Sequence, residues 1–145
     1  MENKKSEELL AEIYRNCQLA ITSIADILPE TDDEELKKVI LAQHEEYEKI
    51  SARAAVLAKN KGYEIKPPNP MKKAMMWGSI KMNTLTDNSR SHIADMMVQG
   101  TVMGITSLKT SLSDMEYPKD EEICGLAEEL LSLEEKFEQT LKEYL

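Results

Sequence analysis

Both histidines of the chain, His44 and His92, lie near carboxylates that could share a metal ion with them. Glu46 follows shortly after the first histidine, and Asp95 follows shortly after the second. Imidazole and carboxylate groups are ligands that iron and other transition metals accept. One metal ion could be held by His44 or Glu46 together with His92 and Asp95, provided that the two helices carrying them meet at matching heights.

The methionines suggest copper as an alternative metal. Eight of the 9 methionines fall between Met71 and Met115, and Met96 and Met103 share a predicted helix face with His92. Histidine and thioether ligands suit Cu(I). Methionine at this spacing is more often core packing, however, because its flexible side chain fills irregular gaps.

Buried amides offer a simpler interpretation of the same two segments. Gln43 lies within an apolar stripe, and Gln99 shares the helix face of His92. An unpaired buried amide costs free energy, so we expect these two to bond to each other or to the backbone. In this interpretation the histidines lie at polar helix edges and bind no metal.

Other active-site chemistries have little support. The sequence contains no G-x-S-x-G, no P-loop and no Gly-rich dinucleotide motif. Its 2 cysteines, Cys17 and Cys124, are too few for a disulfide framework or a Cys-based zinc site, and both fall at apolar helix positions. We expect both to be buried reduced thiols.

Composition excludes two classes of partner. The formal net charge is −9 and no basic patch is visible, which argues against nucleic acid. No apolar run approaches the ~20 residues of a membrane span. The first residues, MENKKSEELL, lead directly into an amphipathic helix without the apolar core of a signal peptide. We therefore expect a cytoplasmic protein that contacts neither nucleic acid nor membrane.

Hydrophobic periodicity predicts an all-α chain that forms one domain over residues 1–145. Five helices are expected, over residues 3–28, 32–61, 71–86, 88–114 and 119–145.

Local signals mark the ends of these helices. Pro29 ends the first, and the TDDE stretch of residues 31–34 has the pattern of a capping box for the second. Gly62 is a typical C-terminal glycine, and Asn69 followed by Pro70 predicts the N-cap and first residue of the next helix.

The segment between the second helix and Asn88 is long enough to cross a whole helical bundle. Its helical part spans ~24 Å and its proline-rich part ~20 Å, against ~40 Å for each long helix. A four-helix bundle with one long central crossover, here containing a short extra helix, is the ferritin-like arrangement. If the helix continued unbroken through Asp87–Ser89, a plain up-down bundle would result instead, and the sequence leaves this open.

In helix order and length, and in the segment MWGSIKMNTLTDNSRSHIADMMVQG of residues 76–100, the chain resembles small bacterial ferritin-like and rubrerythrin-related proteins. The resemblance covers nearly the whole chain. It implies a four-helix bundle and, as the chemistry of the family, a di-iron site in which two helices each supply Glu and the other two each supply Glu-x-x-His. Leu41 and Ser89 stand three residues before His44 and His92, so neither histidine completes that motif.

The first and last helices depart further from such a site. On the first helix Glu12 and Gln18 lie off the apolar stripe. On the last helix Glu134 lies only at the edge of the expected inward track, which consists of Leu126, Leu130, Leu133 and Phe137. We expect no intact di-iron site.

The sequence therefore predicts a non-catalytic ferritin-like bundle with degenerate di-metal ligands, which acts as a binding or structural module without a resident cofactor. The alternative is an iron- or copper-binding oxidoreductase or storage protein, with an atypical site between residues 32–61 and 88–114.

Two further features concern contacts between helices and between chains. Gly100 and Gly104, four apart on one helix, would let a neighbouring backbone or a bulky group such as Trp77 approach closely. The short crossover helix places Trp77, Met76 and Ile80 on more than one side, and this apolar surplus predicts a homodimer interface.

Overall fold

The computed structural model describes residues 2–115 and 120–145, with side chains from Lys4 onward. Within these residues the chain is entirely helical, without strands. The elements are α1 (Glu2–Ile27), a short 3₁₀ turn (Leu28–Glu30), α2 (Glu34–Lys61), α3 (Pro70–Thr86), α4 (Arg90–Ser113) and α5 (Glu121–Lys142). The all-α prediction is confirmed. The predicted break at Tyr117 and Pro118, and residue 119, lie outside the described residues.

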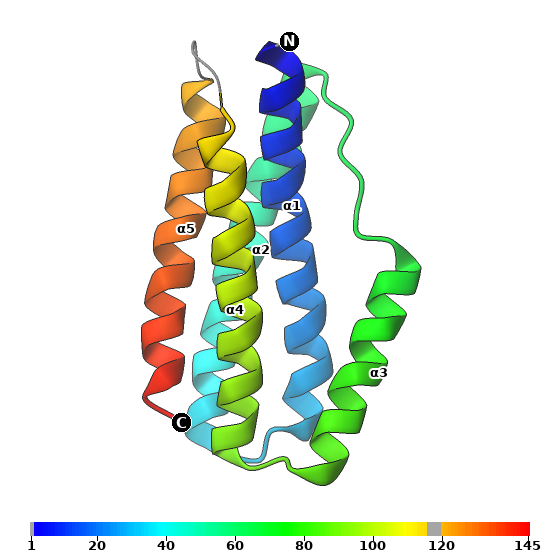
Figure 1. Cartoon of the computed structure of the whole chain (residues 1–145), viewed down its shortest axis with the longest axis vertical. Coiled ribbons are helices and arrows are strands. Elements are labelled where there is room, and N and C mark those ends of the chain that lie inside the picture. The colour runs from blue at the N-terminus through cyan, green and yellow to red at the C-terminus, as the bar shows by residue number, and fades with distance from the viewer. Residues whose placement is uncertain (1, 116–119) are drawn as a thin grey trace.

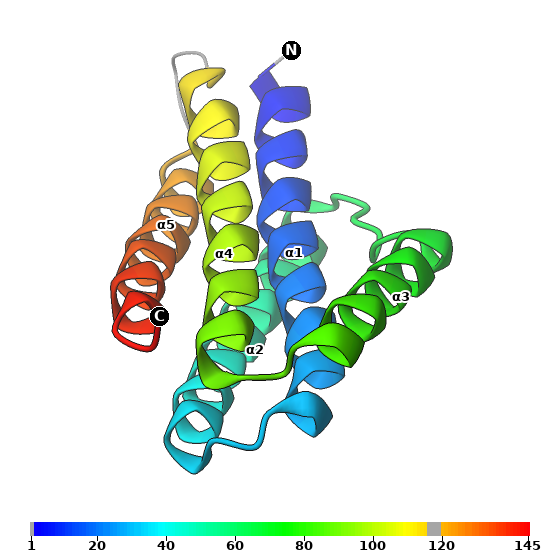
Figure 2. The same cartoon turned by 60° about the horizontal axis from the view of Figure 1, so that its bottom comes forward.

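The four long helices α1, α2, α4 and α5 lie side by side, and α3 lies outside them against α1 (Figures 1 and 2). The proline-rich segment and α3 together return the chain to the end at which α2 began. There Arg90, at the start of α4, lies 3.7 Å from the carboxylate of Asp33, just ahead of α2. Consequently α2 and α4 run parallel. Within the ring of helices α2 and α4 lie diagonally opposite, because each packs against α1 and α5 but not closely against the other.

Residues 87–89 interrupt the helix between α3 and α4, which settles the question that the sequence left open. The side chain of Ser89 caps α4 by accepting a hydrogen bond from the amide of His92. A helix cannot continue through Ser89 while its backbone is extended, so α3 and α4 are separate helices.

Most of the predicted helix ends are confirmed. Asn69 caps α3 by accepting from the amide of Met71, and Pro70 is its first residue. Gly62 adopts a left-handed conformation with φ 71°, and the amide of Tyr63 donates to the carbonyl of Ala58 at 2.8 Å, which closes α2.

The predicted capping box of α2 is wrong in detail. The capping side chain belongs to Asp33, which accepts from the amide of Leu36 at 2.8 Å. The hydroxyl of Thr31 instead donates to the carbonyl of Ile27 at 2.9 Å. Thr31 therefore satisfies a carbonyl at the end of α1, where orphan acceptors need partners, while Asp33 satisfies an orphan donor of α2.

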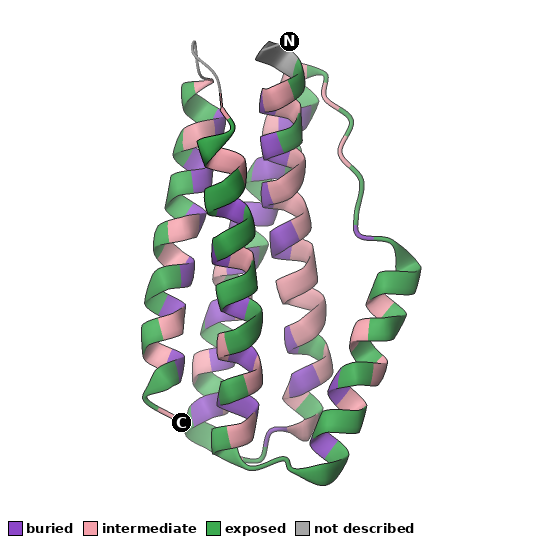
Figure 3. Ribbon diagram, viewed as in Figure 1, coloured by how far each residue is buried: buried purple, intermediate pink, exposed green. Residues whose placement is uncertain are grey.

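The core follows from apolar stripes that face one another across the four long helices (Figure 3). Fully buried leucine and isoleucine side chains from α1, α2, α4 and α5 supply most of its volume. Cys17 is buried within it and Cys124 is half-buried, and neither forms a disulfide. Among the described helices none is long and apolar enough to cross a bilayer.

The crossover helix α3 buries little of its surface. Only Ile80 and Thr84 are buried, and Met76 packs partly against the core. Lys81 forms an ion pair with Glu30 near the end of α1. The outward side is exposed (Figure 3), and its exposed side chains are largely apolar. We call the following residues the α3 outer face: Met71, Met75, Trp77, Met82 and Leu85.

Candidate functional site

Among the residues that the structure describes, one carboxyl group, that of Glu134 on α5, lies inside the core, and Glu134 is only 1% exposed. Glu134 is four residues after Leu130 and three before Phe137, both of which are buried, so it shares their face of the helix. The expected inward track is therefore corrected: Leu133 is half-buried, and Glu134 takes the inward position.

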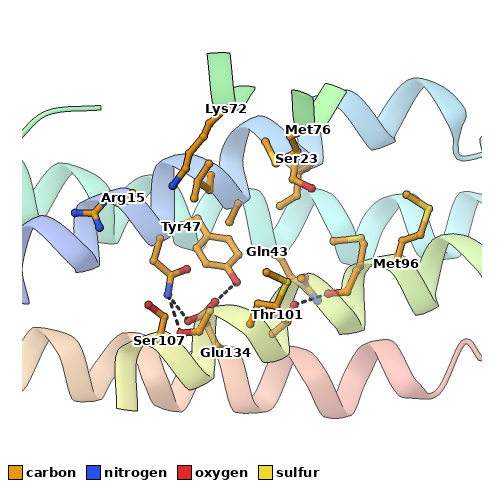
Figure 4. Close-up of a pocket in the computed structure, with 18 of the residues that line it drawn as sticks. Arg15, Ser23, Gln43, Tyr47, Lys72, Met76, Met96, Thr101, Ser107 and Glu134 are labelled. Atoms are coloured by element: carbon orange, nitrogen blue, oxygen red, sulfur yellow. Dashed lines mark hydrogen bonds between the residues drawn. The ribbon is translucent and has the colours of Figure 1, made fainter. Parts of the chain in front are cut away.

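Glu134 is held by hydrogen bonds from two other helices. The hydroxyl of Tyr47 on α2 donates to Oε2 at 2.9 Å, and the amide of Asn16 on α1 donates to Oε1 at 2.9 Å (Figure 4). The Asn16 amide also donates to the backbone carbonyl of Gly104 on α4 at 3.3 Å. The ring of Tyr47 packs against Phe137 with a centroid separation of 5.4 Å, which fixes its hydroxyl over α5. Each long helix thus supplies one member of a buried cluster, which consists of Asn16, Tyr47, Gly104 and Glu134. We call this group the cluster.

Gly104 makes this arrangement sterically feasible. A Cβ atom at this position would lie 2.7 Å from Oε2 of Glu134 and 3.0 Å from Oδ1 of Asn16. The close approach predicted at the two glycines therefore occurs at Gly104, but the approaching group is a carboxylate and an amide, not α3 or Trp77. At Gly100 a Cβ would meet nothing within 4 Å.

Burial raises the pKa of Glu134 to about 7, because a carboxylate loses hydration in the core. The hydrogen bonds from Tyr47 and Asn16 act in the opposite direction, and the charge of Glu12 raises the pKa further. Burial also raises the pKa of Tyr47 and that of Cys17, with the nearby Glu134 charge acting in the same direction. Near neutral pH the cluster therefore titrates through Glu134.

The cluster forms the floor of a pocket of about 380 Å³ between α1, α4 and the overlying α3 (Figure 4). Arg15 and Lys72 supply its basic lining, and Gly100 lies on the α4 side. Gln43 is buried beside the floor, and its Nε2 has no hydrogen-bond acceptor within the described part of the chain. The remaining lining is mainly apolar and includes Leu19, Ile24, Met76, Met96, Met97 and Met103.

The four residues singled out as metal ligands do not lie together in this pocket. On α2, Nδ1 of His44 lies 2.9 Å from a carboxylate oxygen of Glu48, and Glu46 lies 3.4 Å from Lys49. On α4, His92 is half-buried one turn from the helix start.

Asp95 is exposed and accepts a hydrogen bond from Gln99 at 2.9 Å. The predicted pairing of Gln99 with Gln43 in the core is therefore wrong, since Gln99 lies at the surface. The diagonal placement of α2 and α4 explains why these residues do not meet. Across residues 2–115 and 120–145, no three His, Cys, Asp or Glu side chains form a group that could hold a metal ion. Binding of iron or copper stays a prediction from the sequence.

Two members of the cluster, Asn16 and Glu134, were missed by the sequence reasoning, although periodicity contains a signal for both. Asn16 stands three residues after Ile13 and four before Ala20, on the apolar stripe of α1. A polar residue at such a position is buried and needs a partner. The partner could not be identified, because Asn16 and Glu134 are 118 residues apart.

The chain was compared with models of protein families, with curated proteins and with solved structures, and none of them gives a significant match.

Proposed function

We propose that the chain is a ferritin-like four-helix bundle with degenerate metal ligands, and that it binds a small organic molecule in the pocket beneath α3. The parallel course of α2 and α4, joined by a crossover along the bundle, supports the ferritin-like arrangement. So does the position of the cluster, into which all four long helices project a group. Among the described residues, Glu134 is the only acidic side chain buried in the core, where such a bundle would carry several acidic ligands.

The pocket is the observation that carries the proposal. A volume of about 380 Å³ suits a small ligand, and the lining combines apolar walls with a few converging polar groups. A buried acid of shifted pKa at the floor is typical of binding and active sites.

The polar groups favour binding over catalysis. Both oxygens of Glu134 already accept hydrogen bonds. The other carboxylate in the lining, Glu12, pairs with Arg15 at 2.8 Å. General acid–base catalysis usually couples two groups in complementary roles, and Glu134 has no second free carboxylate beside it in the lining. We therefore propose a carrier or sensor, in the cytoplasm as the sequence predicts.

Gly100→Leu tests the pocket with Nile red, a neutral dye whose fluorescence rises in apolar surroundings. Since a Cβ at Gly100 meets nothing within 4 Å, leucine should enter the pocket without disturbing the fold. The helix propensity of leucine exceeds that of glycine by about 1 kcal/mol, so the substitution should not unfold the protein. A loss of binding would therefore result from the filled pocket. We expect saturable binding by the natural protein and an affinity about tenfold weaker or more in the variant.

Gly125→Leu is the matched control, because Gly125 is an exposed glycine of α5 outside the pocket. It should bind the dye as the natural protein does. Equal binding by Gly100→Leu and Gly125→Leu would mean that the dye does not occupy the pocket, and the proposal would fail.

We also propose that a second copy of the chain covers the α3 outer face, giving the predicted homodimer. Of the three residues predicted for the interface, Ile80 is buried and Met76 half-buried, whereas Trp77 is 52% exposed. Residues 65–86 contain four of the 18 basic residues and none of the 27 acidic ones. A second copy offers this basic, apolar helix the acidic surface that complements it.

Met82→Glu combined with Leu85→Glu should convert the dimer to a monomer in light scattering after size exclusion, since these side chains are 73% and 84% exposed. Leu41→Glu on α2, which is 53% exposed, should leave the dimer intact. A monomeric natural protein, or a dimer that survives the double substitution, would contradict this interface.

A further inference from the structure

Within the described part of the chain, the carboxylate at the pocket floor has no basic partner. Among the ion pairs of residues 2–115 and 120–145, none includes Glu134. Its hydrogen-bond donors, the Tyr47 hydroxyl and the Asn16 amide, are both neutral. Of the two basic residues in the pocket lining, Arg15 pairs with Glu12, and Lys72 is exposed on α3. The ionised form of Glu134 therefore lies in the core without a counter-charge.

A buried charge without a counter-charge is costly, and proteins normally resolve it by protonation, by an ion pair or by a bound ion. A metal ion would need several ligands of the oxygen or nitrogen type, and Glu134 is the only carboxylate that the described residues place at the floor. A cation that brings its own apolar body needs only one carboxylate and the apolar walls around it.

A second observation points to a ligand in the same pocket. Gln43 is only 3% exposed and lines the pocket, and its Nε2 donor has no acceptor in the described structure. Buried donors are almost always paired, so the Gln43 amide is a donor that a molecule in the pocket could use. A ligand that satisfies both groups carries a positive nitrogen for Glu134 and an oxygen for Gln43.

We propose that the pocket binds a small apolar organic cation, whose ammonium group pairs with Glu134 and whose hydrogen-bond acceptor takes the Gln43 amide. This inference rests on the proposed binding function and names its ligand class. The methionine side chains of the walls adapt to hydrocarbon of varied shape, so the walls select for apolar character and the floor selects for charge.

The pairing makes binding depend on pH in a defined direction. An organic ammonium binds the ionised form of Glu134, so affinity increases as pH rises through about 7. The titratable groups that face Glu134 are Glu12 and Cys17 of α1 and Tyr47 of α2. The raised pKa values of Cys17 and Tyr47 keep both neutral here.

The remaining polar groups of the pocket lining are basic or do not titrate. Arg15 of α1 and Lys72 of α3 also line the pocket, whereas α4 contributes only groups that do not titrate: Thr101, Gly104 and Ser107.

Three probes share a phenyl ring and an ether oxygen: phenoxyethylamine, phenoxyethanol and phenoxyacetate. Comparing them separates the contribution of charge to binding from that of the apolar ring. They carry a positive, a neutral and a negative end group, respectively. Calorimetry at about pH 8 should give about tenfold tighter binding for the amine than for the alcohol, and weaker binding for the carboxylate. Glu134→Gln should remove the preference for the amine, so that the amine and the alcohol bind the variant equally.

The outcomes distinguish the ligand class from the pocket itself. If amine and alcohol bind equally, or if the preference for the amine persists in Glu134→Gln, the cation inference is overturned while the binding pocket stands. Gly100→Leu should abolish binding of all three probes. If no probe and no dye binds the natural protein, the inference and the proposed function fail together.

Discussion

Glu134→Gln is expected to change the pH dependence of stability by about 2 to 3 kcal/mol between about pH 5 and pH 8. The free energy of unfolding of the natural protein should fall over this interval relative to that of the variant. At about pH 8 the variant should be the more stable protein, although it lacks one ionisable group. Few substitutions of a buried, hydrogen-bonded side chain stabilise a protein, so the effect is distinctive.

The direction of this pH dependence follows from the pKa of the Glu134 carboxyl group in the folded and in the unfolded state. In the unfolded chain the carboxyl ionises near its ordinary pKa of 4.5, whereas in the folded protein it keeps its proton to about pH 7. Between these values unfolding releases a proton, and a rising pH therefore favours the unfolded state. Below about 4.5 this penalty is absent, and above about 7 it is constant. Glutamine is neutral throughout and has no such penalty.

Urea unfolding of both proteins at about pH 5 and pH 8 measures the effect as a difference of differences. Titrating groups that do not face Glu134 contribute equally to both proteins and cancel. Tyr47 can satisfy the new amide as it satisfied the carboxylate, because a hydroxyl both donates and accepts. Parallel pH dependence in the two proteins would show that Glu134 titrates normally, and the account of the cluster would be wrong.

Helix type and order could be predicted because they depend on local pattern. The apolar stripes, the proline-rich segment and the Asn69-Pro70 start of α3 act within one or two turns of the chain. The crossover also followed, because its length alone requires the chain to travel along the bundle.

The sequence predicts Leu133, not Glu134, on the inward track of α5, because charged residues are rarely buried. This general rule fails at Glu134. Both tracks share Leu130 and Phe137, and the choice between them depends on Asn16 and Tyr47 from other helices. No local pattern reports such long-range partners.

The α3 helix shows a second limit of periodicity. Its sequence places Met71, Met75, Met82 and Leu85 on one face, and that face is exposed in the single chain. The buried side carries Ile80 instead. A helix with two apolar sides does not reveal from its own pattern which side packs inward, because both sides satisfy the same period.

Gly104→Ala is expected to destabilise the protein by about 1 to 3 kcal/mol, the usual range for overpacking a core. The new methyl group would lie 2.7 Å from Oε2 of Glu134 and close to both polar atoms of the Asn16 amide. Neither side chain can move freely, because each is buried and bonded to the other. The loss outweighs the gain of up to about 1 kcal/mol that alanine normally brings to a helix.

Gly100→Ala supplies the matched control, since it lies one turn earlier on the same helix and its Cβ meets nothing within 4 Å. This variant should be more stable than the natural protein by about 0.5 to 1 kcal/mol. A double-mutant cycle then locates the cause of the Gly104→Ala effect. In a Glu134→Ala background the clashing oxygen is absent, so the cost of Gly104→Ala should fall by at least about half. If the effects of Gly104→Ala and Glu134→Ala on the free energy of unfolding are strictly additive, Gly104 is required for a reason other than the nearby carboxylate. If they are strongly coupled, the packing of α4 against α1 and α5 depends on the buried carboxyl group of Glu134.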